Sequence, residues 1–182
     1  MAEVRYARPG EPLAPPYAPG AFILTHGPVF VNKMIRFGEA LRYRGDLRPY
    51  AYWSHAAVVV DEQGTLIQAL THGVSKGHIS DYTAQPVAYV DVVQSEQDRT
   101  ESVAFARQAL GEGYGFLTIV AVALHALTGG RLVIGIDGTE ICSGLVARCL
   151  ERGPTIFTHH DPSNITPADL SRHFGVGRPL GW

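Results

Sequence analysis

Apolar and polar positions alternate along the first half of the chain in a way that predicts β-strands. An apolar, β-branched run at 55–60 is followed by polar turn residues at 61–64 and by a second apolar run at 65–70. Two such runs joined by a short turn that contains glycine predict a β-hairpin. Similar runs predict three further strands, at 21–25, 73–79 and 87–93.

The segment before residue 20 has a different pattern. It contains five prolines, which exclude a helix or a central strand because proline lacks the backbone N–H donor. We therefore expect residues 1–19 to form an extended or disordered arm and residues 20–182 to form one domain.

Apolar positions at helical spacing predict helices in the rest of the chain, beginning at Pro28, Ser95, Gly115, Ile141 and Thr166. Ser95 is the expected N-cap of its helix, with Asp98 at the position where a capping box carries Glu or Gln. The helix at 116–127 is apolar on nearly every side and is expected to be buried. A short strand or extended segment is expected at 132–136. The predicted fold class is α+β, an antiparallel sheet packed with helices.

Length, charge and hydropathy exclude several classes of function. The chain has 182 residues, 46% of them hydrophobic, and its 15 Lys and Arg against 17 Asp and Glu give a net charge of −2. This balance excludes a strongly basic nucleic-acid-binding domain. The longest apolar stretch, at 116–127, is shorter than the roughly 20 residues that a bilayer span needs, and the N-terminus lacks the apolar region of a secretory signal. We expect a cytoplasmic protein without a transmembrane segment, which leaves the cell only by lysis, a phage particle or another export route.

Cys142 and Cys149 are the two cysteines of the chain. Within one helix they lie about 10 Å apart, beyond the roughly 7 Å that a disulfide spans. Cys142 stands where an extended segment turns into a helix, and free N–H groups and the helix dipole there favour a thiolate. It is either a nucleophile or a small buried apolar residue. Cys149 lies on the apolar helix face with Leu145 and is expected to be structural.

His55 and Gln68 lie on the two strands of the predicted hairpin. His55, at the mouth of the hairpin, is a candidate general base for Cys142, and Gln68 could accept a hydrogen bond from the imidazole and fix its tautomer. The alternatives are an interior histidine bound to a backbone carbonyl and an ordinary polar strand residue.

Five short motifs follow one another in a characteristic order: Ser54-His55-Ala-Ala-Val-Val-Val, Leu66-Ile-Gln-Ala-Leu, Gly73-Val74, Tyr114-Gly-Phe-Leu and Cys142-Ser-Gly-Leu-Val. In this order the chain resembles the circularly permuted NlpC/P60 (papain-like) cysteine hydrolases of the YiiX-like group, over roughly residues 20–171.

The resemblance implies a papain-like α+β core in permuted order, in which the histidine strand precedes the cysteine helix. It implies Cys142 as nucleophile, His55 as general base and Gln68 as the third polar residue. Many members of the family carry Glu at the position of Gln68, and a neutral amide orients the imidazole without stabilising its charge. Tyr114 matches an aromatic position that lines the family's site, although a packed tyrosine at a helix entrance is the alternative.

The expected activity is attack by Cys142 on an amide, ester or thioester carbonyl, by a cysteine hydrolase or acyltransferase that requires no metal or other cofactor. By resemblance the substrate is a cell-wall peptide or a lipid acyl group. A rival hypothesis is a papain-like binding module for a peptide or acyl ligand with little turnover, and a structural assembly component is a third. The cluster His159-His160-Asp161 lacks metal-ligand spacing and is interpreted as a polar loop.

Overall fold

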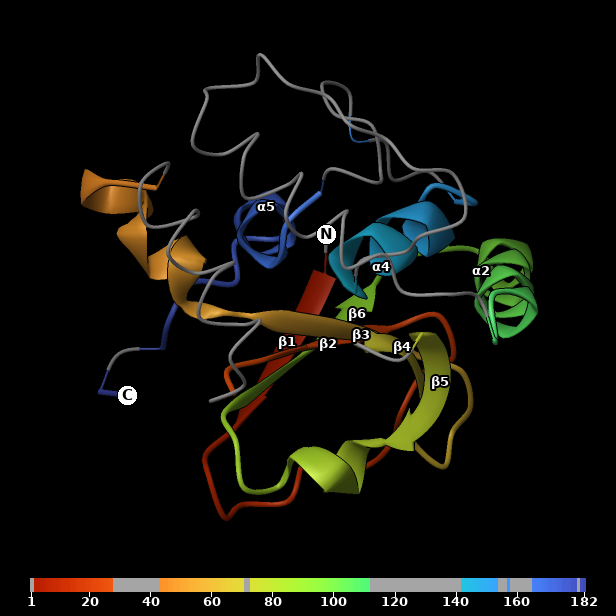
Figure 1. Cartoon of the computed structure of the whole chain (residues 1–182), viewed down its shortest axis with the longest axis horizontal. Helices are drawn as coiled ribbons and strands as arrows, with labels where there is room; N and C mark the ends of the chain where they lie inside the picture. The colour runs from red at the N-terminus through yellow and green to blue at the C-terminus, as the bar shows by residue number, and fades with distance from the viewer. Residues whose placement is uncertain are drawn as a thin grey trace.

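The computed structural model describes residues 2–27, 43–70, 73–111, 142–153, 157, 165–179 and 181–182. Six strands in the described part form one sheet, and helices pack on one of its faces (Figure 1). This mixed arrangement of an antiparallel sheet with helices agrees with the predicted α+β class.

The strands lie in the order β1-β6-β2-β3-β4-β5, and every neighbouring pair is antiparallel. Their bounds are β1 Ala2–Ala7, β2 Phe22–Thr25, β3 His55–Val59, β4 Thr65–Leu70, β5 Gly73–His78 and β6 Val87–Val92. The predicted hairpin and the three further predicted strands are therefore confirmed, each end lying within one residue of its expected position.

The turn of the hairpin is held by its own polar residues. Asp61 Oδ1 accepts hydrogen bonds from the backbone N–H groups of Gln63 at 3.1 Å and Thr65 at 2.9 Å. Gly64 follows with φ of 91°, a conformation that residues with a Cβ rarely adopt. These local bonds explain why the sequence pattern located this turn correctly.

The N-terminal segment departs from the expectation of an arm that precedes the domain. Residues 2–7 form β1, which pairs with β6 at one edge of the sheet. The first proline is Pro9, so β1 keeps all of its backbone donors. The Arg5 guanidinium donates to the carbonyls of Ala14 at 2.7 Å and Pro16 at 2.6 Å. The proline-rich residues are thereby tied back to the strand that precedes them.

Three α-helices in the described part are α2 Glu96–Gln108, α4 Cys142–Leu150 and α5 Pro167–His173. The expected N-cap at Ser95 is confirmed: Ser95 Oγ accepts from the N–H of Asp98 at 3.1 Å, and Asp98 Oδ2 accepts from the N–H of Ser95 at 3.2 Å. Aspartate thus completes the capping box in place of Glu or Gln. Thr166 and Asp169 form the same box at α5.

Two 3₁₀ helices, η1 Gly45–Tyr52 and η2 Ile79–Tyr82, connect the strands. The helices expected from Pro28 and at 116–127, and the extended segment expected at 132–136, lie outside the described residues.

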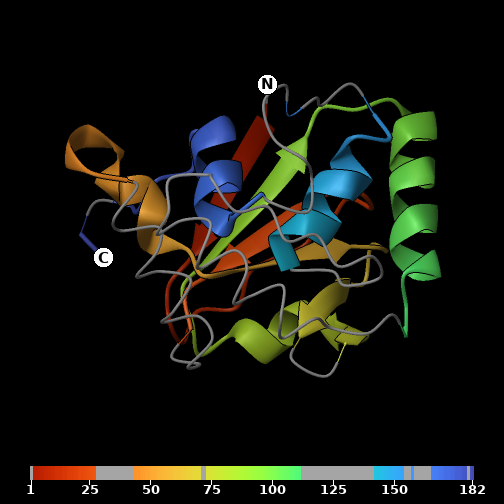
Figure 2. The same ribbon diagram turned by 45° about the horizontal axis from the view of Figure 1, so that its top comes forward.

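The sheet separates two apolar cores, because alternate residues of a strand face opposite sides. In β3, Ala56 and Val58 belong to the core beneath α2, α4 and α5, whereas Ala57 and Val59 belong to the other core. We call the first side the helix face and the second, which carries Tyr82 of η2, the η2 face. Figures 1 and 2 show the three helices gathered on the helix face.

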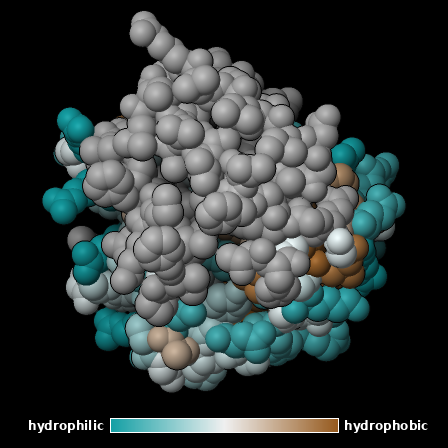
Figure 3. Space-filling model, viewed as in Figure 1, coloured by the Kyte–Doolittle hydropathy of each residue, from teal (hydrophilic) through white to brown (hydrophobic). Residues whose placement is uncertain are grey.

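The described surface is mostly polar where β5 and η2 lie, along the lower edge of the molecule in Figure 3. Tyr6 and Val93 are the large hydrophobic residues that the described part exposes. None of the helices in the described ranges has the length and apolar character that crossing a membrane requires.

Candidate active site

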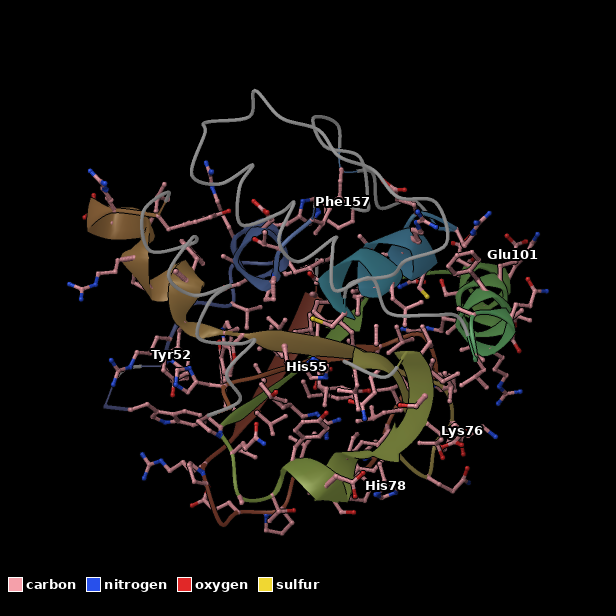
Figure 4. All side chains as sticks on the ribbon, viewed as in Figure 1. Tyr52, His55, Lys76, His78, Glu101 and Phe157 are labelled. Carbon is pink, nitrogen blue, oxygen red and sulfur yellow. The ribbon has the colours of Figure 1, made fainter. Side chains whose placement is uncertain are left out.

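His55 is the first residue of β3, and its surroundings fix the backbone there. The preceding Ser54 donates its N–H to the carbonyl of Thr25 on β2 at 2.9 Å. One residue earlier, Trp53 donates its indole N–H to the carbonyl of Val176 at 2.6 Å. His55 is 6% exposed. Its side chain points to the η2 face, on the side of β3 away from α4 (Figure 4). The imidazole is thus buried and held at a defined end of the strand.

Gln68 on β4 binds the imidazole from the same face. Residues 66 and 68 share one side of β4, and Leu66 belongs to the core of the η2 face. The distance between His55 Nε2 and Gln68 Oε1 is 3.0 Å. A carbonyl oxygen only accepts, so His55 Nε2 carries the proton of the neutral ring. The other ring nitrogen, Nδ1, is then free to accept a proton.

A gap between β3 and β4 opens the sheet beside this pair. The ladder between these strands consists of the pairs at Val58 and Val59 and extends no nearer to His55. The N–H of Val59 donates to the carbonyl of Ala21, the residue just before β2. Successive N–H groups of a strand point to opposite neighbours, so the N–H of Ala56 faces β4. With no strand partner there, it faces the sulfur of Cys142 and helps to lower the pKa of that thiol. The opened ladder thus becomes part of the thiol's environment.

Cys142 is the first residue of α4 and is 3% exposed. The side chain of His55 and the backbone N–H of Ser143 lie close enough to its sulfur to act on the pKa of the thiol. The hydroxyl of Ser143 donates to the carbonyl of Ile165 at 2.6 Å, which fixes the start of α4 against the segment leading into α5. The thiol of the helix face therefore meets the imidazole of the η2 face where β3 and β4 separate.

The two groups shift each other's protonation. Burial acts to raise the pKa of Cys142, but the charge and hydrogen bond of His55, with the N–H groups of Ala56 and Ser143, outweigh it and lower the pKa. Burial acts to lower the pKa of His55, but the charge and hydrogen bond of Cys142 and the bond to Gln68 raise it. Both shifts favour a thiolate beside an imidazolium.

Tyr82 at the end of η2 joins the site, and the sequence analysis did not identify it. Its hydroxyl donates to Gln68 Oε1, and its ring stacks on His55 with centroids 5.8 Å apart and planes 24° apart. Tyr82 follows β5 by one short helical turn and belongs to no motif. Only the packing of η2 against the sheet brings it to His55, so no local signal was available.

Gly77 on β5 provides the space that the Gln68 amide occupies. A Cβ built on Gly77 would lie 2.4 Å from Gln68 Nε2, closer than side chains can approach. A glycine in a strand often marks such a close contact. Its role as a spacer was also missed, because it depends on the cross-strand neighbour.

The structure brings three of the four predicted site residues together: Cys142, His55 and Gln68. The fourth, Tyr114, lies outside the described residues. Cys149 is buried at the other end of α4, and neither cysteine is in a disulfide, as their predicted spacing in a helix requires.

The described part of the chain does not support a metal site. No group of three or more His, Cys, Asp or Glu side chains in these ranges is placed to hold a metal ion. His78 uses its ring to cap η2, with Nδ1 accepting from the N–H of Ser80 at 3.2 Å and Nε2 bound to the carbonyl of Gln63 at 2.9 Å. The cluster His159-His160-Asp161 lies outside the described residues.

Comparison with protein families yields no matching family model for this chain, and comparison with curated proteins yields no match.

Proposed function

We propose that the protein is a cysteine hydrolase or acyltransferase with Cys142 as nucleophile, His55 as general acid and base, and Gln68 as the residue that orients His55. The observation that carries this proposal is the juxtaposition of three side chains: the His55 imidazole lies beside the Cys142 thiol, whose pKa it lowers, and 3.0 Å from Gln68 Oε1. A nucleophile, a base within hydrogen-bond reach and a third group that orients the base form the arrangement used for covalent catalysis.

In the proposed reaction the Cys142 thiolate attacks a carbonyl carbon and forms a tetrahedral intermediate. Backbone N–H groups at the start of α4 stabilise its oxyanion, since donors at a helix N-terminus favour negative charge. The carbon–leaving-group bond then breaks, and the imidazolium of His55 gives its proton to the departing amine, alcohol or thiol. A thioester remains on Cys142.

Water or another nucleophile resolves this acyl-enzyme. Neutral His55 removes a proton from the incoming nucleophile, which attacks the thioester and releases Cys142 as thiolate. The cycle ends with the thiolate and imidazolium restored. Water as nucleophile makes the protein a hydrolase, and another acceptor makes it an acyltransferase.

Several features support a papain-like core in permuted order, of the kind found in NlpC/P60 hydrolases. The histidine is on a strand, β3, that precedes the cysteine helix α4 in the chain, and α4 packs on an antiparallel sheet. On this proposal the substrate is an amide, ester or thioester, such as a cell-wall peptide or a lipid acyl group.

The experiment is to trap the acyl-enzyme with p-nitrophenyl acetate as probe. We expect rapid release of nitrophenol equivalent to one site per chain, with one acetyl group on Cys142 by peptide mass mapping. The His55→Ala variant should acylate more slowly by about 10²- to 10⁴-fold, the usual contribution of a general base.

Cys149→Ser is the matched control, because it removes the other thiol of the same helix and should acetylate at Cys142 as the wild type does. Acetyl groups spread over lysines, with no dependence on Cys142 or His55 in folded protein, would contradict the proposal. That outcome would favour the binding module with little turnover.

A further inference from the structure

The proposed site depends on which end of the Gln68 amide faces His55. An amide has an acceptor, Oε1, and a donor, Nε2. With Oε1 toward His55 Nε2, that ring nitrogen carries the proton and Nδ1 is free to accept the proton of Cys142. With the amide turned, the neutral ring holds its proton on Nδ1 and cannot act as base for the thiol.

A carboxylate at this position would have no such ambiguity, because its two oxygens are equivalent acceptors. The neutral Gln68 therefore needs a neighbour that distinguishes its two ends. Gln68 is 5% exposed, so solvent offers its amide little help.

Tyr82 is the neighbour with the required chemistry. Burial raises the pKa of Tyr82 well above its ordinary value, so the hydroxyl keeps its proton and remains a donor. The hydroxyl's hydrogen bond among the described residues goes to Gln68 Oε1. If the amide turned, the hydroxyl would accept from Nε2 and its own proton would lose this partner in a buried place.

Resting on the proposed function, we propose that Tyr82 is a positioning residue: by donating to Gln68 Oε1 it keeps that oxygen against His55 and so sets the tautomer of the general base. In this role the hydroxyl of Tyr82 acts through Gln68, while its ring stacks on the imidazole of His55.

The test uses Tyr82→Phe, which keeps the ring and removes the hydroxyl, alone and combined with Gln68→Glu. In the Gln68 protein, Tyr82→Phe should slow alkylation of Cys142 by iodoacetamide at neutral pH by about tenfold, the effect of losing one net hydrogen bond. In the Gln68→Glu background the same substitution should slow alkylation by no more than about twofold, because the two oxygens of a carboxylate are equivalent acceptors.

Nitrogen NMR of labelled histidine measures the tautomer of His55 directly and requires no activity assay. At a pH above the raised pKa of His55, where the ring is neutral, it should carry its proton on Nε2 in the wild type and populate the Nδ1–H form in Tyr82→Phe. Tyr89→Phe is the matched control, because Tyr89 is a buried tyrosine of the same face whose hydroxyl accepts from the N–H of Ala18. It should leave both readouts unchanged.

Equal losses in the Gln68 and Gln68→Glu backgrounds, or an unchanged His55 tautomer in folded Tyr82→Phe, would overturn this inference. Neither result bears on Cys142 as nucleophile. If instead the wild type formed no acyl-enzyme but Tyr82→Phe altered the tautomer, the positioning role would stand while the proposed function failed.

Discussion

The two ends of helix α4 carry the same residue type in different surroundings. Cys142 at the N-terminal end is 3% exposed and Cys149 near the C-terminal end is 1% exposed, and both contact the core of the helix face. At the first end the thiol meets His55 and two backbone N–H groups. At the second, the Cys149 carbonyl accepts from the hydroxyl of Ser102 at 2.6 Å and ties α4 to α2.

The comparison teaches that burial does not distinguish the proposed nucleophile from the other cysteine of the helix. The difference comes from the sheet beneath the helix. Under Cys142 the ladder between β3 and β4 is open and presents the N–H of Ala56 and the ring of His55. The shifted pKa of Cys142 thus depends on the strand gap as much as on the helix terminus.

The largest effect within this comparison is expected from filling the space beside Gln68. Gly77→Ala would place a Cβ against Gln68 Nε2 and displace the amide from His55, so we expect Cys142 alkylation to slow by about tenfold. Lys76→Ala, an exposed change on the same strand, should have no effect.

A double-mutant cycle tests whether Gly77→Ala acts through the Gln68 amide. Once Gln68→Ala has removed the amide, adding Gly77→Ala should slow alkylation little further. A full tenfold loss in the Gln68→Ala background would mean that Gly77 acts through the backbone of β5 and not through the amide.

The smallest effect on reactivity is expected at the other end of α4. Ser102→Ala removes the buried hydrogen bond to the Cys149 carbonyl and should lower the free energy of unfolding by about 1 kcal/mol. A lower denaturation midpoint in urea with an unchanged m-value measures this loss. Alkylation of Cys142 should stay within about twofold of the wild type, and a loss comparable to that of Gly77→Ala would show that the two ends are coupled.

Local patterns sufficed for the strands and for part of the site. The turn at 61–64 and the alternation on both sides of it predicted the hairpin, and a hairpin places His55 and Gln68 on adjacent strands. The predicted helix start then singled out Cys142. These residues were predictable because short-range pairing brings two of them together and a helix start marks the third.

The rest depends on contacts between distant segments. Tyr82 and Gly77 act only because β5 and η2 return against β4, which no spacing in the chain reveals. The edge strand β1 was missed because the prolines that follow it dominated the pattern of the whole N-terminal segment. The gap beside the Ala56 N–H reflects how far the ladder between β3 and β4 extends, a property that alternation alone does not determine.

The pH dependence of iodoacetamide alkylation, mapped separately at Cys142 and Cys149, tests the central claim most directly. Alkylation follows the thiolate fraction, so its rate rises as pH passes through the pKa of the thiol. We predict that folded wild type is labelled at Cys142 with an apparent pKa below the ordinary value of about 8.5. Cys149 should remain unlabelled until the protein unfolds.

Removing the charge of His55 leaves burial as the main influence, so His55→Ala should raise the apparent pKa of Cys142 above its ordinary value. An apparent pKa at Cys142 near that of an ordinary thiol in the wild type, unchanged in His55→Ala, would contradict the thiolate–imidazolium pair and with it the proposed nucleophile.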